Sequence, residues 1–446
     1  MAGKLVFLET FGCQMNDNDS MRMLSILKDL GYSRTDATEM ADLIIINTCS
    51  VRGKAEHKVY STIGRFKRLK REKPSLIIGV SGCVAQQEGE RLLKRSPYLD
   101  IVLGPQNIHR LKEILSAASL GKERVVATAQ SAAIDDSEYG RITPASGEKA
   151  SVSIMRGCDN FCSYCIVPYT RGREVSRGSA GIIRDVAALA SSGVREVTLL
   201  GQNVNSYGAG AKADATFPEL LRIVAGVEGI ERVRFITSHP RDISEELIYL
   251  FGEEPKLCRH IHLPVQSGSD AVLERMGRGY TKKGYMSKVS LLKKLYPDIS
   301  VTTDMIVGFP GETEGDFKDT MDLINEARFD NVFSFMYSPR PGTPAAGFAG
   351  HAALDVKSER LHVLQETQRG ITEERNRALV GKRAEVLVEG ESKASPEELS
   401  GRTSCNRVVN FQGPKVLTGT LADVIITDAF PNSLRGVYQD SMSFTA

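Results

Sequence analysis

Three of the eight cysteines of this chain lie close together, in the segment Arg156-Gly157-Cys158-Asp159-Asn160-Phe161-Cys162-Ser163-Tyr164-Cys165. Their spacing, C-x3-C-x2-C, is poor for zinc, which favours paired C-x2-C elements and four ligands. Three thiolates on one tight loop instead suit three irons of a 4Fe–4S cluster, and they leave the fourth iron open to a small chelating molecule. This cysteine loop, residues 156–165, therefore predicts a reaction centre. A surface loop with three incidental cysteines is the alternative.

An aromatic residue, Tyr164, stands directly before the last of these cysteines. With it, the motif resembles the signature of the radical S-adenosylmethionine superfamily. The resemblance implies that Cys158, Cys162 and Cys165 hold a 4Fe–4S cluster whose open iron is chelated by S-adenosylmethionine. In that superfamily one electron from the cluster cleaves the sulfonium and releases a 5′-deoxyadenosyl radical. The motif does not identify the substrate.

The composition indicates an ordinary soluble globular protein of several domains. The chain has 446 residues, 41% hydrophobic and 25% charged, which predicts two to four domains. No apolar run approaches eighteen residues, and residues 1–9 resemble a first strand rather than a signal peptide, so no membrane association is expected. Eight cysteines without a secretion signal favour a reducing cytoplasm and metal ligation. Because the net charge is only +2, any surface that binds nucleic acid must be local.

Residues 1–125 alternate short apolar runs with helical patterns, which predicts a doubly wound parallel sheet. The expected strands are 5–8, 43–46, 76–80 and 101–103, and the expected helices lie near 18–30, 54–72, 87–95 and 106–118. Cys13, Cys49 and Cys83 each follow the end of a different strand by three to five residues. Ligand sites of open α/β sheets lie beyond these ends. The pattern predicts a second three-thiolate cluster; a zinc site and three buried small side chains are the alternatives.

A strongly basic segment begins three residues after Cys49. Residues 52–73 contain nine Lys or Arg against two Glu. A solvated helix face is the usual interpretation of such a run. Its place at the mouth of a reaction site instead favours contacts with nucleic-acid phosphates. The residues expected to make them are Arg65, Lys67, Arg68 and Lys70.

After a linker near 120–150, residues 145–378 are expected to form a second domain. Strand–helix units recur there, with strands at 151–156, 194–200, 232–237, 260–265, 300–307 and 331–337. Six units fit an incomplete (β/α)6 barrel, whose sites lie at the carboxyl ends of the strands. Small and polar residues end several of these strands near the cysteine loop. The residues expected to bind the cofactor are Tyr164, Gly201, Gln202, Ser238, Gln266 and Val307.

A helix near 356–379 leads to a third domain, residues 380–446. Short strands expected at 384–389, 405–411, 417–427 and 436–438 predict a small β-barrel of the oligonucleotide-binding type. This domain has seven Lys or Arg against eight Asp or Glu, so RNA contacts must come from individual residues such as Arg402 and Arg407. Cys258 and Cys405 have no partner motif and are expected to be packing residues.

The order of the three domains resembles the methylthiotransferases over essentially the whole chain. Four motifs are similar to the MiaB branch of that family: residues 10–16 (TFGCQMN), 47–52 (NTCSVR), 166–174 (IVPYTRGRE) and 200–207 (LGQNVNSY). The resemblance implies an N-terminal methylthiotransferase domain, a radical S-adenosylmethionine domain and a C-terminal TRAM domain. It also implies that Cys13, Cys49 and Cys83 carry a second 4Fe–4S cluster that holds or supplies sulfur.

The branch adds a methylthio group to C2 of N6-isopentenyladenosine beside the tRNA anticodon, with S-adenosylmethionine as both methyl donor and radical source. The expected partners are therefore a tRNA anticodon stem–loop and an electron donor of flavodoxin or ferredoxin type, and a monomer is expected. Sister branches act on threonylcarbamoyl-adenosine in tRNA or on an aspartate of a ribosomal protein. An RNA-binding iron–sulfur module without catalysis is the alternative from another functional class.

The chemistry of the target explains these parts. The adenine C2–H bond is neither acidic nor electrophilic, so acid–base catalysis has nothing to act on and a radical is required. The base must also leave its stack, which favours a splayed loop over duplex RNA. Arg171, Arg173 and Arg177 follow the cysteine loop and are expected to contact phosphate or a cofactor carboxylate, with salt bridges as the alternative.

Overall fold

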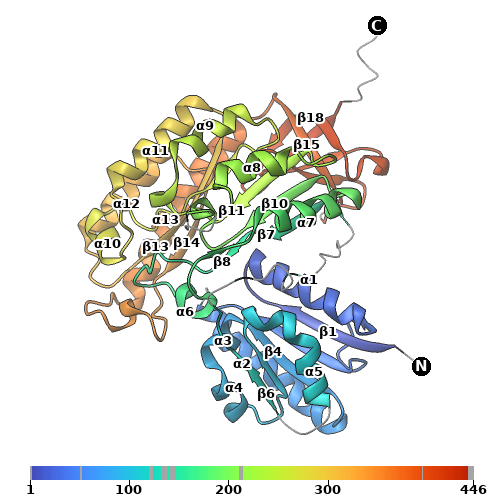
Figure 1. Cartoon of the computed structure of the whole chain (residues 1–446). Helices are drawn as coiled ribbons and strands as arrows, with labels where there is room; N and C mark the ends of the chain where they lie inside the picture. Colours follow the sequence, from blue (N-terminus) through green and yellow to red (C-terminus); the bar gives the residue numbers. More distant parts are fainter. Residues whose placement is uncertain are drawn as a thin grey trace.

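The computed structural model describes residues 3–50, 53–119, 124–131, 134, 139, 147–209, 214–393 and 395–439, and for residues 53–58 it describes the backbone alone. Figure 1 shows an N-terminal α/β unit in blue and cyan, a central curved sheet covered by helices, and a small red barrel near the C-terminus. This arrangement confirms the predicted fold class. None of the helices within the described ranges is both long and apolar enough to cross a membrane.

The N-terminal unit contains a six-stranded parallel sheet in the order β2-β1-β3-β4-β5-β6. The strands are β1 (Lys4–Thr10), β2 (Tyr32–Arg34), β3 (Leu43–Thr48), β4 (Ile77–Gly82), β5 (Ile101–Leu103) and β6 (Val125–Ala127). The four predicted strands are confirmed. The sequence did not predict β2 and β6, because runs of three residues carry little periodicity. Strands β3 and β4 are buried along their whole length, as expected for the centre of a parallel sheet.

Helices cover both faces of this sheet, so the doubly wound arrangement is confirmed. They are α1 (Gln14–Asp29), α2 (Gly53–Glu72), α3 (Cys83–Glu88), α4 (Glu90–Arg95), the 3-10 helix η1 (Pro105–Arg110) and α5 (Leu111–Ser119). One apolar core includes Leu27 and Leu115, and the other includes Phe66 and Leu92. The helix predicted near 87–95 is in fact two helices, because Gly89 between them has φ +50, a conformation that favours glycine.

The central unit is an open barrel of six parallel strands. They are β7 (Lys149–Ser153), β10 (Glu196–Leu200), β11 (Arg232–Ile236), β12 (His260–His262), β13 (Ser300–Val307) and β14 (Asn331–Met336). They form two three-stranded sheets, β11-β10-β7 and β12-β13-β14, which meet where β11 contacts β12. All six predicted strands are confirmed, although the first ends at Ser153. A separate strand β8 (Met155–Arg156) then pairs with β9 (Val175–Ser176) and leads into the cysteine loop.

Helices pack on the outer surface of the open barrel (Figure 1). They are α7 (Ser179–Ser191), α8 (Phe217–Ala225), α9 (Glu245–Glu253), α10 (Asp270–Arg275), α11 (Lys282–Leu295), α12 (Glu314–Ala327) and α13 (Leu354–Arg377). Between them and the strands lies the largest apolar core of the molecule. The outermost strands are β7 and β14, so the barrel is open between these two edges.

The C-terminal unit is a closed five-stranded barrel in the order β15-β16-β17-β19-β18. Its strands are β15 (Arg383–Glu391), β16 (Leu399–Thr403), β17 (Val408–Gln412), β18 (Leu421–Ala429) and β19 (Leu434–Tyr438). The small β-barrel is confirmed, but β16 was missed. Two predicted boundaries were wrong: β17 begins after Asn406, which has φ +65, and β18 begins after the 3-10 helix η6 (Lys415–Leu417).

Candidate functional site

The sheet-edge cysteines, Cys13, Cys49 and Cys83, lie at the carboxyl ends of three adjacent strands. Cys13 precedes α1, Cys49 directly follows β3, and Cys83 is the first residue of α3 after β4. Strands β1, β3 and β4 are neighbours in the sheet. The Cys13 and Cys49 side chains hydrogen-bond to each other. The expected grouping of three thiols at one edge of the sheet is therefore present.

Two glycines allow these turns to pack tightly against one another. Gly12 has φ +121, and a Cβ atom there would lie 2.3 Å from the Cβ atom of Cys49. Gly82 has φ +90, and its Cβ would lie 2.2 Å from the carbonyl oxygen of Thr48. Each glycine directly precedes a cysteine, so no other residue fits there without moving the turn that carries the thiol. The sequence analysis did not single out these glycines.

Arg171 connects the sheet-edge cysteines with the barrel. It is the last residue of α6 (Val167–Arg171), the short helix that follows the cysteine loop. Its guanidinium is buried, lies 2.7 Å from a carboxylate oxygen of Asp19 and donates a 2.9 Å hydrogen bond to Asn16 Oδ1. It also hydrogen-bonds to the Cys83 thiol. The expectation of a phosphate contact was therefore wrong for Arg171, because its guanidinium forms a buried ion pair with Asp19.

This charge also affects the neighbouring thiol. The hydrogen bond with Cys49 and the charge of Arg171 lower the pKa of Cys13 to about 6, although burial opposes the change. Burial also opposes the charge on Arg171, but Asp19 and the nearby thiols outweigh it and raise the arginine pKa. Cys13 therefore favours the thiolate, which is the form that binds metal.

The cysteine loop itself is held by the end of α10 and the residue that follows it. Ser163 donates its hydroxyl to the carbonyl oxygen of Arg275 at 2.8 Å and its amide to that of Met276 at 2.9 Å. Gly157, with φ +77, precedes the first cysteine, and a Cβ there would lie 2.0 Å from the Arg173 carbonyl oxygen. These hydrogen bonds and the close packing at Gly157 fix the backbone conformation of the loop. Burial raises the pKa of Cys158 to about 11 and of Cys165 to about 12, so a bound cation is needed to ionise these thiols at neutral pH.

Arg278 is a residue of this site that the sequence analysis missed. Its buried guanidinium donates to the Cys162 thiol at 3.3 Å, to the Tyr164 hydroxyl at 3.4 Å and to the carbonyl oxygen of Pro264 at 2.6 Å. Arg278 and Cys162 are 116 residues apart in the sequence, so no local motif predicts their contact. Arg278 therefore places a positive charge beside the cysteine loop.

The residues predicted to bind a cofactor meet at the same rim, with one exception. Gln202 accepts a 2.6 Å hydrogen bond from the Gly157 amide, and Gly201 lies so close to Met155 that a Cβ would be 2.5 Å from its Cγ. Ser238 is buried just after β11, and Gln266, with φ +77, pairs its backbone with β13. The exception is Val307, because its side chain lies in the core between barrel and helices.

Acidic side chains collect on the other side of the cysteine loop. Asp242 accepts a 2.7 Å hydrogen bond from Asn203, and its carboxylate lies 3.4 Å from Asn160 Nδ2. Burial raises the pKa of Glu174 to about 7; the negative charges of Asp159 and Asp242 add to this, whereas a hydrogen bond with Ser206 opposes it. The rim thus combines thiols, one buried guanidinium and an acidic edge.

Three families match successive parts of the chain: uncharacterized protein family UPF0004 at residues 5–104, the radical SAM superfamily at 152–324 and the TRAM domain at 377–438. Among curated relatives, the tRNA-2-methylthio-N(6)-dimethylallyladenosine synthase of Geobacter sulfurreducens is 54% identical over 97% of either chain. The protein of the same name from Legionella pneumophila is 48% identical, again over 97% of each. The chain belongs to the family of tRNA-2-methylthio-N(6)-dimethylallyladenosine synthases.

Solved structures agree with this membership at the level of the fold. The radical S-adenosylmethionine methyltransferase TsrM from Kitasatospora setae matches with a TM-score of 0.56 at 16% identity, over 77% of each chain. At this identity the likeness concerns the fold alone. For the synthase family, the superfamily match implies S-adenosylmethionine and a 4Fe–4S cluster, and the TRAM domain indicates RNA binding.

The residues around the cysteine loop fit such a cluster and cofactor. Three thiols face one rim, and two buried polar atoms there, Ser238 Oγ and Asn160 Oδ1, have no hydrogen-bond partner among the described residues. Unpartnered buried polar atoms are costly unless a ligand satisfies them. Within the described ranges, no three Cys, His, Asp or Glu side chains are close enough to share one metal ion.

The residues predicted to bind RNA are not equally available. On α2, Arg65, Lys67 and Arg68 are exposed, whereas the Lys70 ammonium lies 2.8 Å from Asp100 and donates to the Leu76 carbonyl oxygen. Arg65 also pairs with Glu9, and Arg68 with Glu72, both in exposed positions.

The two arginines of the C-terminal barrel are engaged within the protein. Arg402 lies 3.3 Å from Glu389, and Arg407 pairs with Asp330 and donates to Asn376. The structure therefore leaves the solvent face of α2 as the freer basic surface of the predicted set. Of the other arginines, Arg177 is buried against Asp185 and Arg173 is exposed beside Asp159.

Proposed function

We propose that this chain adds a methylthio group to C2 of N6-dimethylallyladenosine beside the tRNA anticodon, with S-adenosylmethionine as both methyl donor and radical source. The names of relatives that are about half identical over almost the whole chain support this activity. The observation that carries it is that α6 connects two three-cysteine sites: it begins two residues after Cys165, and Arg171 at its end hydrogen-bonds to Cys83.

We assign one 4Fe–4S cluster to the cysteine loop, held by Cys158, Cys162 and Cys165, and a second to the sheet-edge cysteines. When bound, S-adenosylmethionine and the clusters supply the one-electron chemistry and the sulfur that this substitution at a C–H bond requires. Tyr164, Gly201, Gln202, Ser238 and Gln266 are proposed to bind S-adenosylmethionine. Within this assignment Gln202 orients the loop through the Gly157 amide, and Arg278 stabilises negative charge on Cys162.

We assign residues 1–125 to the methylthiotransferase domain, 145–378 to the radical domain and 380–446 to the TRAM domain. The substrate is an anticodon stem–loop, because only an unpaired base can leave its stack at low cost. We further propose that the protein acts as a monomer in the cytoplasm and takes its electrons from a donor of flavodoxin or ferredoxin type.

The test counts iron and follows the product with two triple variants. Wild type should hold about eight iron atoms after anaerobic reconstitution, and each Cys→Ala triple variant about four. Loss of the loop cysteines should abolish cleavage of S-adenosylmethionine. Loss of the sheet-edge cysteines should spare that cleavage and remove methylthio product, measured by nucleoside mass spectrometry. Cys405→Ser, outside both sites, is the control. Stoichiometric zinc, or four irons in the wild type, would contradict the two-cluster assignment.

A further inference from the structure

The last strand of the open barrel exposes two large apolar side chains. In β14, Phe333 is 45% and Phe335 is 37% exposed, whereas Val332 between the barrel and its helices is buried. Ser334 accepts a hydrogen bond from Gln365 of α13, which covers the outer side of this strand. Because successive side chains of a strand point to opposite faces, Phe333 and Phe335 face the interior of the open barrel.

Their neighbours connect this surface with the cysteine loop. In the parallel pair β13–β14, Phe333 is opposite Asp304 and Phe335 is opposite Ile306. Ile306 packs against the small apolar cluster that also contacts Tyr164, the aromatic residue of the cysteine loop. The apolar surface formed by Ile306, Phe333 and Phe335 therefore begins beside the reaction centre and extends along the open edge.

Other strands present polar side chains to the same interior. Thr198, Arg234 and His260, from β10, β11 and β12, line a cavity of about 420 Å³ there. The His262 ring, on the same strand as His260, is 5.7 Å from that of Phe333. A hydrocarbon group placed there would displace water from these polar side chains, which is unfavourable. Two exposed phenylalanines on an edge strand are also a liability for aggregation, so a function for them is expected.

We propose that Phe333 and Phe335, together with Ile306, bind the dimethylallyl group on N6 of the target adenosine. This inference rests on the proposed function, and it identifies the residues that select an adenosine with a dimethylallyl group. The group is a branched five-carbon hydrocarbon, and the two rings offer it a flat apolar surface next to the loop where the base reacts. An N6 substituent that carries a carboxylate would bring its charge beside Asp304, so the same surface disfavours it.

The experiment compares two anticodon stem–loop RNAs that differ only in the N6 substituent. Dissociation constants are measured anaerobically on the reconstituted protein with dimethylallyl-adenosine RNA and with the unmodified RNA. One methylene in an apolar pocket corresponds to roughly 10- to 200-fold, so a preference of at least this size is expected for a five-carbon group. The double variant Phe333→Ala/Phe335→Ala should lose most of this preference and keep its affinity for the unmodified RNA. That retained affinity also demonstrates that the variant is folded.

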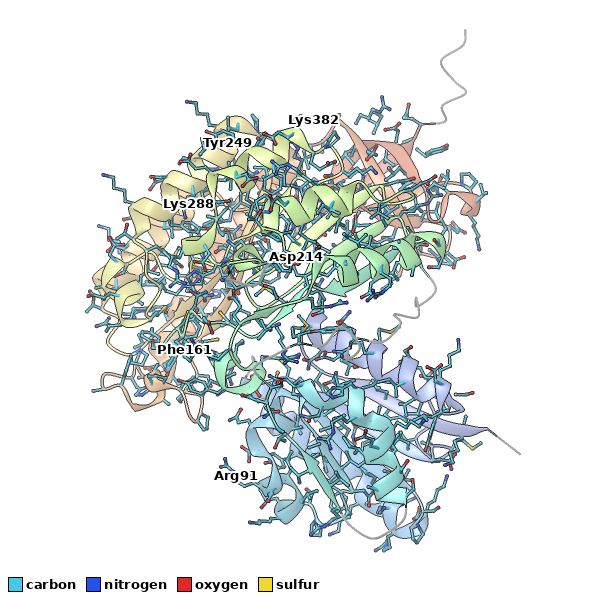
Figure 2. The ribbon with its side chains drawn as sticks, in the orientation of Figure 1. Arg91, Phe161, Asp214, Tyr249, Lys288 and Lys382 are labelled. Atoms are coloured by element: carbon cyan, nitrogen blue, oxygen red, sulfur yellow. The ribbon has the colours of Figure 1, made fainter. Side chains whose placement is uncertain are left out.

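Tyr249 provides a matched control, because it is 45% exposed on α9 at the outer surface of the barrel (Figure 2). Tyr249→Ala should leave the preference intact. The proposal is overturned if the double variant keeps the wild-type preference, if it loses affinity for both RNAs equally, or if the wild type shows no preference. Failure of the proposed function is a separate result, because then the wild type would form no methylthio product from the dimethylallyl RNA.

Discussion

The solvent face of α2 offers a quantitative test of how the protein holds tRNA. Lys67, Arg68 and Arg71 are exposed, while Phe66 on the opposite side is buried in the core. Successive helix residues turn by about 100°, so these three basic residues fall within an arc of about 100°. They can face one RNA backbone together. The variant to make is therefore Lys67→Gln/Arg68→Gln/Arg71→Gln.

The magnitude follows from counterion release. Each phosphate contact contributes roughly 0.7 to 0.9 to the slope of log affinity against log salt, so three contacts contribute roughly 2.1 to 2.7. Between 50 and 200 mM salt, the wild type should therefore lose about 20- to 40-fold more affinity for an anticodon stem–loop than the triple variant does. Cleavage of S-adenosylmethionine without RNA should be unchanged, because α2 is not part of the cysteine loop.

The assay is a salt titration of the dissociation constant, with Lys70→Gln as the control from the same helix. Lys70 is committed to Asp100 and the Leu76 carbonyl oxygen, so its replacement should leave the slope unchanged. If the triple variant had the wild-type slope of log affinity against log salt, the solvent face of α2 would make no contact with RNA and the reasoning would be refuted. The contact would then have to be sought in the C-terminal barrel.

Three further predictions concern charges near the two cysteine sites. Arg278→Gln removes the positive charge beside Cys162 and should lower the reduction potential of the loop's cluster by on the order of 60 mV, tenfold in a one-electron equilibrium; an unchanged redox titration would contradict this. The pKa of Glu174 rises from its ordinary 4.5 to about 7. Between pH 4.5 and about 7 the folded state therefore binds a proton that the unfolded state has lost. Wild-type stability should therefore fall as pH rises from about 5 to 8. Glu174→Gln should remove this pH dependence and stabilise the protein at pH 8 in urea unfolding without cofactor, by less than the full pKa shift implies because solvent screens the partly exposed carboxylate. Arg171→Ala should destabilise the protein by less than the roughly 3–5 kcal/mol of a buried charge with no partner left, because Arg22 still lies 3.7 Å from Asp19, and adding Asp19→Asn should recover part of that loss.

Local patterns were sufficient to predict the fold and the positions of the six clustered cysteines. Alternating apolar runs define strands and helices, and the carboxyl ends of parallel strands meet at one edge, so Cys13, Cys49 and Cys83 had to come together. The elements that escaped prediction are short or are bounded by irregular backbone. The three-residue strands β2 and β6 carry almost no period, and the start of β17 depends on the left-handed turn at Asn406.

Charged residues were harder to interpret, because a charge is assigned to the surface unless its partner is known. Arg171 was expected at a phosphate and is buried with Asp19, 152 positions away in sequence (171 − 19). Lys70 was expected to bind RNA and instead pairs with Asp100. Arg278 carried no motif at all, and only the fold brings it to Cys162. Long-range pairs of this kind arise from tertiary packing and leave no local signal.

The helix α6 explains how the two cysteine sites keep a fixed relation across two domains. It begins two residues after Cys165 and has five residues, a length of about 7.5 Å. The carbonyl groups at its carboxyl end would lack partners, but side chains of the preceding part of the chain supply them: Gln106 donates to the Arg171 carbonyl oxygen at 2.8 Å, and Gln130 donates to that of Tyr169 at 3.0 Å. The helix α6 thus extends from the cysteine loop and is capped by side chains that precede it in the chain. Arg171 at its end hydrogen-bonds to the Cys83 thiol of the sheet-edge cysteines. Because α6 fixes the cysteine loop relative to the sheet-edge cysteines, mutations that loosen α6 should lower product formation more than they lower cleavage of S-adenosylmethionine.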